Sequence, residues 1–594
     1  MHRGGILGTP RALVRFGLCA AALTVGLPAF SSAARWWRLP LWGAEVRAFA
    51  VDPFQAGIVY LGTSRGNFYG STDGGASWQA LHKGSAFPGY VVTALVADPA
   101  APGHFWAALA GQYAGGIVAV SEDRGATWKT LARWQKSVAT RALAVAPGPG
   151  PLLAIGGDDG VRLSRDGGKT WAPSGADTEG LQQVESLAFD PSDPRTLYAG
   201  TWRQAFRTKD GGATWTRIAA GMVLDATVYA WDFAAKDPRD IWVSTCGWVY
   251  HTEDGGDRWT RFTQGFTNRR SHAVRRDPTR PGTIYAATVG GLHRSTDGGR
   301  SWERVSRESL VVTALAVDPR TGRLYVGTEG EGVFTSNDGG ATLESGATGL
   351  AEGRVADLVP DPNDSSRVYF FRAYGGDESG VWVAEGTTVR RVSADPLPAA
   401  ASLTAFRDAA GKTFLMLASS SGLKVSRDGG VRWSACEAPP PGAPVAIFGA
   451  PYRQPVLVTS AGVYGVGDDG RSFTVVAGSP SGAIAAGLLA GSAGGPVLEV
   501  KTADTDFRWD GRGWTGRRRA VLAGGFFVSE ANAASPGAYS SLQDVDGKLV
   551  WEEGNRRLAL TSPRSGLALA TAAAAAGGRV YIGTAGDGLY LFEP

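Results

Sequence analysis

The octet STDGGRSW, Ser295–Trp302, decides the fold because the chain repeats it. Copies stand at 71–78 (STDGGASW), 121–128 (SEDRGATW), 164–171 (SRDGGKTW), 208–215 (TKDGGATW), 252–259 (TEDGGDRW), 336–343 (SNDGGATL) and 426–433 (SRDGGVRW), with a decayed form, VGDDGRSF, at 466–473. Their third-position acids are Asp73, Asp123, Asp166, Asp210, Asp254, Asp297, Asp338, Asp428 and Asp468. Neighbouring acids lie about 40–50 residues apart, with one gap of about twice that length, and such a period is typical of β-propeller blades.

The residues between two octets have the pattern of three strands. An apolar run ends in Asp-Pro, as in AFAVDP at 48–53, and a β-branched and aromatic strand ends in Gly-Thr, as in IVYLGT at 58–63. A short third strand leads into the octet, and a fourth begins at its tryptophan. Within the octet we expect the carboxylate to accept backbone N–H bonds, the glycines to supply positive φ and the indole to fill space between sheets. The octet acids are therefore predicted to be structural.

Composition and the first residues fit a secreted all-β protein. The 594 residues include 84 glycines and 20 tryptophans, and a chain of this length exceeds one ordinary core. Arginines followed by the apolar run at 16–27 and by SSAA at 31–34 predict a signal peptide over residues 1–34 and a secreted or periplasmic location. Without those residues the net charge falls from +4 to about +1, which gives no support for a nucleic-acid partner. Neither the cysteines nor the histidines have the spacing of a metal site, and no cofactor is predicted.

The octet resembles the Asp-box, or BNR repeat, of sialidases, sortilin-type receptors, xyloglucan-hydrolysing endo-glucanases and photosystem II assembly-factor-like propellers. The resemblance is clear over residues 45 to about 475. It implies four-stranded Asp-box blades. Counting the units along the chain gives about 13, too many for one ring, so we expect tandem propellers of seven plus six or seven plus seven blades. RVYIGTAGDGLYLF at 579–592 lacks a fourth strand, which RWWRLPLWG at 35–43 could supply to close a ring. The predicted domains are a propeller over 35–350 and a second over 351–594.

Candidate binding residues lie on the face opposite the octets. The inner strands of the first seven units align, and their second residues are Arg47, Thr93, Arg141, Glu185, Tyr229, His272 and Thr313. One residue at the same level of seven strands forms a ring at the channel mouth, either as a ligand site or as solvated strand starts. Nearby loops add Trp202, Arg203, Trp248, Arg269 and Arg270, a set suited to contact with a protein segment or a glycan.

The enzymatic members of the family match less well, so no residue is assigned a catalytic role. The F/Y-R-I-P segment of sialidases is absent, and Tyr229 with Glu185 makes only a weak counterpart of their nucleophile pair. Where the xyloglucan-cleaving family carries a catalytic acid in a T-D-I-G-G context, this chain reads TSRGN, with Ser64 at the acid's place. Asp377 and Glu378 remain as loop acids. We therefore expect a non-enzymatic, scaffold- or assembly-factor-like binding protein; the alternative is a glycoside hydrolase with an unrecognised acid pair.

Overall fold

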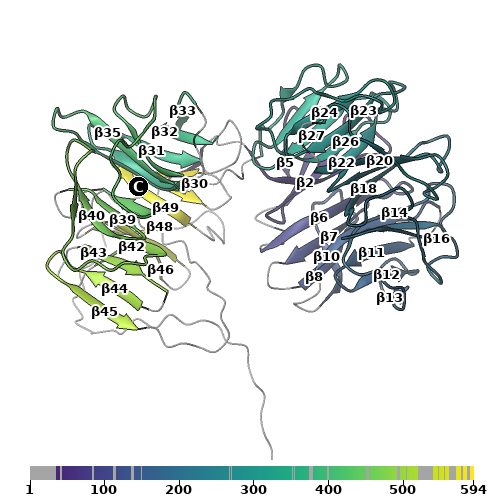
Figure 1. Cartoon of the computed structure of the whole chain (residues 1–594), viewed down its shortest axis with the longest axis horizontal. Coiled ribbons are helices and arrows are strands. Elements are labelled where there is room, and N and C mark those ends of the chain that lie inside the picture. The colour runs from purple at the N-terminus through teal and green to yellow at the C-terminus, as the bar shows by residue number, and fades with distance from the viewer. Residues whose placement is uncertain are drawn as a thin grey trace, which may run out of the picture.

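The computed structural model is all-β and consists of two β-propellers, which Figure 1 shows as separate bodies, purple to teal and green to yellow. It describes residues 35–593 except 40–42, 83–85, 88, 112–114, 135–138, 149, 151, 267, 269, 351, 353–354, 373–378, 396, 398–399, 420, 450–453, 491–495, 504, 519–539, 546–547, 554–555, 561–569, 577–578 and 585–588. The segment predicted to be a signal peptide, 1–34, lies outside this range. Within the described part there are 13 antiparallel sheets, seven in the first propeller and six in the second, which confirms the predicted architecture.

The first propeller contains blades 1–7, each a sheet of four consecutive strands. Blade 1 is β2 (Val46–Val51), β3 (Val59–Thr63), β4 (Phe68–Ser71) and β5 (Gln79–Ala80); blade 2 is β6 (Tyr90–Ala97), β7 (Phe105–Gly111), β8 (Gly115–Ser121) and β9 (Lys129–Arg133); blade 3 is β10 (Thr140–Val145), β11 (Leu153–Gly157), β12 (Gly160–Ser164) and β13 (Ala172–Ser174); blade 4 is β14 (Val184–Phe189), β15 (Leu197–Thr201), β16 (Ala205–Thr208) and β17 (Thr216–Arg217); blade 5 is β18 (Val228–Phe233), β19 (Ile241–Thr245), β20 (Trp248–Thr252) and β21 (Thr260–Phe262); blade 6 is β22 (Ser271–Arg276), β23 (Ile284–Thr288), β24 (Gly291–Ser295) and β25 (Glu303–Arg304); blade 7 is β26 (Val312–Val317), β27 (Leu324–Thr328), β28 (Val333–Ser336) and β29 (Glu344–Ser345).

The second propeller contains blades 8–13. Blade 8 is β30 (Val355–Asp361), β31 (Asp364–Arg372), β32 (Gly380–Glu385) and β33 (Thr388–Arg391); blade 9 is β34 (Ala400–Arg407), β35 (Thr413–Ser419), β36 (Gly422–Ser426) and β37 (Ser434–Ala435); blade 10 is β38 (Pro444–Phe448), β39 (Val456–Thr459), β40 (Gly462–Val466) and β41 (Phe473–Val475); blade 11 is β42 (Ala485–Ala490), β43 (Pro496–Lys501), β44 (Thr505–Trp509) and β45 (Trp514–Arg518); blade 12 is β46 (Ser540–Val545), β47 (Lys548–Glu553) and β48 (Arg556–Leu560); blade 13 is β49 (Ala570–Ala576), β50 (Arg579–Thr584), β51 (Leu589–Glu593) and β1 (Arg35–Arg38).

The β-branched and aromatic strands are buried on both faces. β3, β15, β19, β23 and β27 are buried along their whole length, as expected for sheets that stack against a neighbour on each side. Each ring closes by the same packing. One buried cluster joins Val46 of blade 1 to Tyr325 of blade 7, and another joins Val355 of blade 8 to Tyr581 of blade 13.

The chain passes twice between the two propellers. β1 pairs with β51, so Arg35–Arg38 forms the outer strand of blade 13, and the chain then enters blade 1. It returns after β29. The two passages are hydrogen-bonded to each other: Gly43 N–H donates to the Leu350 carbonyl at 2.6 Å, and Glu352 N–H donates to the Gly43 carbonyl at 2.9 Å. In the sequence, the first propeller is thus inserted between β1, the outer strand of blade 13, and the remaining strands of the second propeller, β30 to β51.

Strand register defines two ends of each blade. In blade 1, Val46 pairs with Thr63, close to the β3–β4 hairpin, while Val59 pairs with both Val51 and Ser71 at the other end. The Asp-box of blade 1 begins at Ser71. We call the end that carries the hairpin between the second and third strands of each blade the loop face. The opposite end, which carries the Asp-boxes, is the box face.

Candidate functional site

A β-bulge near the start of the inner strand is shared by all seven blades of the first propeller. Strand register shifts by one residue there in every blade, and the residues left without a partner are Arg47, Thr93, Arg141, Glu185, Tyr229, His272 and Thr313. These are the seven residues of the predicted ring, and the structure brings them to the loop face. A bulge re-aims the side chain of its extra residue, so the ring is a built feature of the backbone.

The second propeller has bulges of the same kind with different residues. The register shifts at the starts of β30, β34, β38 and β49 leave out Ala356, Ala401, Val445 and Thr571. Three of these four side chains carry no hydrogen-bonding group. The polar ring therefore belongs to the first propeller, and we place the candidate site there.

Several ring side chains are fixed by bonds to the next blade. Thr93 Oγ1 donates to the Thr140 carbonyl at 3.0 Å, and Thr313 Oγ1 donates to the Val46 carbonyl at 2.6 Å. His272 Nδ1 lies 2.9 Å from the Val312 carbonyl oxygen. Because a carbonyl only accepts, Nδ1 carries the proton and Nε2 is left as an acceptor. These bonds orient the ring before any ligand arrives.

The ring differs in charge from one side to the other. On the side of blades 3 and 4, Arg141 forms ion pairs with Asp158 (2.6 Å) and with Glu185. Burial raises the pKa of Glu185 and the Arg141 cation opposes that rise. On the side of blades 6 and 1, burial lowers the pKa of His272, and the cations of Arg270 and Arg47 lower it further. His272 is therefore neutral at pH 7, and the cations on that side are Arg270 and Arg47, of which Arg47 is ion-paired with Glu45.

Aromatic side chains flank the ring. Tyr229 and His272 meet edge to face with ring centroids 6.2 Å apart. Trp202 lies in the β15–β16 hairpin of blade 4 and is 52% exposed. Trp248 begins β20 with φ of 84°, whereas the corresponding hairpin positions of blades 3 and 6 are Gly160 and Gly291 with φ of 103° and 110°. A bulky residue in this conformation is strained, and such strain is commonly found at functional positions.

Some of the remaining predicted loop residues lie in the described part of the chain and others lie outside it. Arg203 and Arg270 are exposed on the loop face. Arg269 lies outside the described residues, as do the loop acids Asp377 and Glu378.

A buried carboxylate that sequence reasoning missed contacts the first-blade hairpin. Glu352, from the passage between propellers, accepts hydrogen bonds from Thr63 Oγ1 (2.9 Å) and Asn67 Nδ2 (2.7 Å). These residues bound the TSRGN hairpin that has Ser64 at the acid's place. Burial raises the pKa of Glu352 to about 7. Its side chain is only 1% exposed, so it fastens the hairpin to the passage and does not face a substrate. The glutamate is distant in sequence from the hairpin, and no motif surrounds it.

The eight complete Asp-boxes share one hydrogen-bond pattern. In each, the first-position hydroxyl donates to the Asp Oδ1 at 2.6–2.9 Å, and the N–H four residues after the Asp donates to it at 2.8–3.0 Å. Hydrogen bonds from Thr170 and Ser164 lower the pKa of Asp166 to about 2. The carboxylates are saturated by their own turns and are ionised at neutral pH.

The decayed ninth box differs from the prediction. Asp469, and not Asp468, accepts the N–H bonds of Arg471 and Ser472, both at 2.9 Å. The first position here is Val466, which lacks the hydroxyl that orients the third-position acid in the other boxes. The turn therefore closes on the neighbouring carboxylate.

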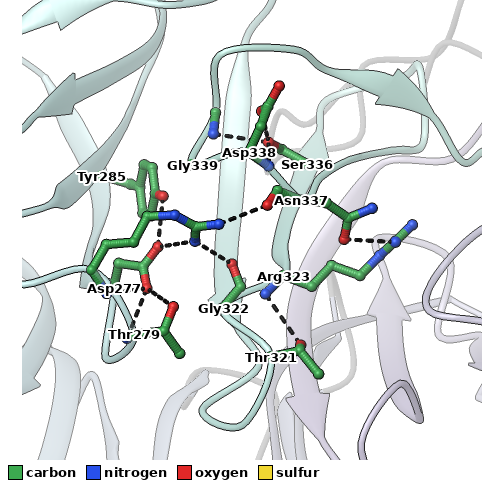
Figure 2. Close-up of polar contacts among 12 residues, drawn as sticks. Asp277, Thr279, Tyr285, Thr321, Gly322, Arg323, Ser336, Asn337, Asp338 and Gly339 are labelled. Carbon is green, nitrogen blue, oxygen red and sulfur yellow. Dashed lines mark hydrogen bonds and ion pairs between the residues drawn. The ribbon is translucent and has the colours of Figure 1, made fainter.

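Asp277, the acid of an Asp-Pro segment, is also engaged in structure, as Figure 2 shows at the box face of blades 6 and 7. Asp277 accepts hydrogen bonds from Thr279 Oγ1 (2.8 Å) and Tyr285 Oη (2.9 Å). Arg280 donates to Asp277 at 2.8 Å and to the Asn337 carbonyl at 2.6 Å, which ties blade 6 to blade 7. Chemistry on the box face would have to break these links.

Metal ligands do not gather at the ring in the described part of the chain. Among the described residues no group of three or more His, Cys, Asp or Glu is placed to hold a metal ion. A cavity of about 280 Å³ lies on the box face between blades 3 and 4, lined by Arg165 and Asp210 among others, and so is remote from the ring. No helix in the described part of the chain is long and apolar enough to cross a membrane.

Comparison with known proteins shows the fold. No protein-family model and no curated protein matches the sequence. The crystal structure of a GH74 xyloglucanase from Xanthomonas campestris is 19% identical, with a TM-score of 0.56 over 95% of this chain and 100% of that one. The structure of an ancestral GH74 enzyme is 15% identical, with a TM-score of 0.64 over 94% and 99%. YCF48 bound to D1 peptide is 15% identical over 52% of this chain and 98% of that one, with a TM-score of 0.40. The predicted likeness to tandem propellers of the xyloglucanase type is thus confirmed for the fold.

Proposed function

We propose that the chain is a non-enzymatic binding protein whose first propeller holds a protein segment or a glycan on its loop face. The observation that carries the proposal is the ring of seven bulged residues, which are polar in the first propeller and mostly apolar at the corresponding places of the second. Binding sites on rigid scaffolds gather on loops at one face, where side chains vary while the strands stay fixed. The first 34 residues support a secreted or periplasmic location for this role.

The state of the carboxylates supports binding over hydrolysis. Each complete Asp-box acid accepts bonds from its own turn, and Ser64 stands where the xyloglucan-cleaving family carries an acid. Glu352 contacts that hairpin but is buried. Hydrolysis of most glycosides needs two carboxyl groups that reach the scissile bond. No such accessible pair lies at the first-blade hairpin among the described residues.

Binding of peptide and glycan arrays by the chain, with and without the double change Arg141→Ala plus Tyr229→Ala, tests the proposal. The ring variant should lose at least about tenfold in affinity for whatever the unmodified chain binds. Arg165→Ala plus Arg427→Ala, on the box face, is the matched control and should bind normally. A ring variant that binds as well as the unmodified chain, with unchanged thermal unfolding, would contradict the proposal, and so would arrays on which nothing binds.

The alternative is a glycoside hydrolase, and the tandem fold shared with GH74 enzymes is the observation in its favour. The discriminating assay is hydrolysis of xyloglucan, other polysaccharides and sialosides. Turnover that disappears on Glu185→Gln or Asp377→Asn would establish the enzyme. Absence of turnover together with retained array binding supports the binding protein.

A further inference from the structure

A group of exposed apolar side chains lies beside the ring. Trp202, Val223 and Leu224 are 52%, 37% and 80% exposed, and we call them the blade 4–5 patch. Trp202 lies in the β15–β16 hairpin, and Val223 and Leu224 lie in the connection from β17 to β18, so all three are on the loop face. The other exposed large apolar side chains of the described residues are Phe54, Val431, Val475 and Ile484. Clustered exposed apolar side chains mark an interaction surface, whereas isolated ones are ordinary.

Hydrogen bonds hold the patch in shape. Gln204 Nε2 donates to the Leu224 carbonyl at 2.9 Å, and Gln204 Oε1 accepts from Arg217 Nε. Thr227 Oγ1 donates to the Trp202 carbonyl at 2.6 Å, which joins the hairpin to the connection. The apolar side chains are therefore presented on a fixed backbone, so binding a partner loses little additional conformational entropy.

The exposed charges at the patch are the cations of Arg203 and Arg217 and the carboxylate of Asp225, which follows Leu224 in the same connection. Arg203 and Arg217 are exposed, and neither forms an ion pair with a carboxylate among the described residues. The acid of the same connection, Asp225, pairs with neither of them. Arg270, on the ring side, likewise has no carboxylate partner in the described part of the chain. An arginine without a carboxylate partner can offer its remaining donors to a carboxylate of a ligand, and in Arg217 only Nε is taken up, by Gln204.

We propose that the blade 4–5 patch docks an acidic protein segment that carries a large apolar side chain. This inference rests on the proposed function and selects a protein segment over a glycan. A sugar ring stacks on an indole, but its hydroxyl-rich edges lose hydration without gaining hydrogen bonds against Val223 and Leu224. An apolar side chain of a partner, in contrast, is stabilised by burying these two side chains. Tryptophan and arginine are also the residues that dominate binding energy at protein interfaces. The apolar side chain would cover Leu224, and the acids would pair with Arg203 and Arg217.

Fluorescence anisotropy with labelled peptides of about twelve residues, long enough to span the patch and the ring, tests this inference. One peptide carries acids and a central Leu and Phe, a second has Lys in place of the acids, and a third has Ser in place of Leu and Phe. The first should bind at least about tenfold tighter than the other two, and more weakly as salt rises.

Two variants and a control locate the contact. Leu224→Asp should weaken binding of the first peptide at least about tenfold, and Arg203→Glu plus Arg217→Glu should shift the preference to the lysine peptide. Ile484→Asp, at a side chain 57% exposed in the second propeller, is the matched control and should change nothing. All three sites are at the surface, so folding should persist.

The outcomes separate this inference from the proposed function. If Leu224→Asp binds normally while the ring variant does not, the patch is excluded and the binding function stands. If only glycans bind, the protein segment is excluded. A dimer in sedimentation that Leu224→Asp dissociates, without peptide binding, would show that the patch meets a second copy and would overturn the inference.

Discussion

Replacing Arg124 by glycine should stabilise the first propeller. Arg124 stands where the other complete boxes have their first glycine, and its φ is 61°, against 71–76° for those glycines. An L-residue in this left-handed region costs about 1–2 kcal/mol. Glycine removes this cost, but its greater conformational freedom in the unfolded chain offsets roughly 0.5–1 kcal/mol of the gain. The Arg124 side chain is exposed and its N–H bond to the Gly103 carbonyl (2.9 Å) survives the change. The net gain is therefore about 0.5–1 kcal/mol.

Urea unfolding followed by tryptophan fluorescence measures this difference, and Gly298→Ala is the matched control. Gly298 has φ of 72°, and a Cβ built there meets nothing within 4 Å, so the change isolates the backbone cost. We expect Gly298→Ala to destabilise by about 1 kcal/mol. The reasoning is refuted if Arg124→Gly lowers the unfolding midpoint, or if Gly298→Ala leaves it unchanged, because the box would then not need the left-handed conformation.

Three further predictions concern pH and ring closure. Burial raises the pKa of Glu352 from 4.5 to about 7, so its stabilising contribution is present at low pH and is lost as pH rises. The free energy of unfolding should therefore fall between pH 5 and 8, by up to ~1.4 kcal/mol per pH unit. Glu352→Gln should reduce this pH dependence, as measured by urea unfolding at a series of pH values. Hydrogen bonds from Ser301 and Ser295 lower the pKa of Asp297 to about 2, so its contribution is present above pH 3.8 and is lost as pH falls through 2. Asp297→Ala should therefore be less stable than the unmodified chain at pH 7, by a margin that shrinks as pH falls from 3.8 to 2. An equal penalty at pH 7 and pH 2 would refute the box account. Deleting Arg35–Arg38 removes the strand that pairs with β51 and should make blade 13 the first site of limited proteolysis, with the first propeller still protected; unchanged proteolysis would show that β1 does not close the ring.

Local repeats in the sequence predict what is local in the structure. The octet STDGGRSW combines a capping hydroxyl, an acceptor acid, glycines with positive φ and an indole, so its eight residues define one turn and its period counts the blades. Aligning the inner strands also predicts the level of Arg141 and Tyr229, because equivalent strands of a propeller meet at one channel. The role of these residues in binding stays a prediction.

Features that depend on long-range contacts escape such reasoning. The bulge at Arg47 is visible only once its pairing with β3 is known, since the sequence pattern alone reads as an ordinary strand start. Glu352 bonds to Thr63, which lies 289 residues earlier in the sequence, because the closed ring brings the two together. The blade 4–5 patch arises from two loops that meet through Gln204. The octet alignment shows that Val466 lacks the hydroxyl, but it does not reveal that the turn then closes on Asp469 in place of Asp468.

Hydrogen exchange with and without the bound acidic peptide tests most directly whether the ligand binds on the loop face and the Asp-box turns are purely structural. The account predicts slower exchange at residues 202–204 and 219–230 and at the bulged strand starts, with box turns such as 164–171 and 295–302 unchanged. Protection confined to the box turns or to the second propeller would contradict it.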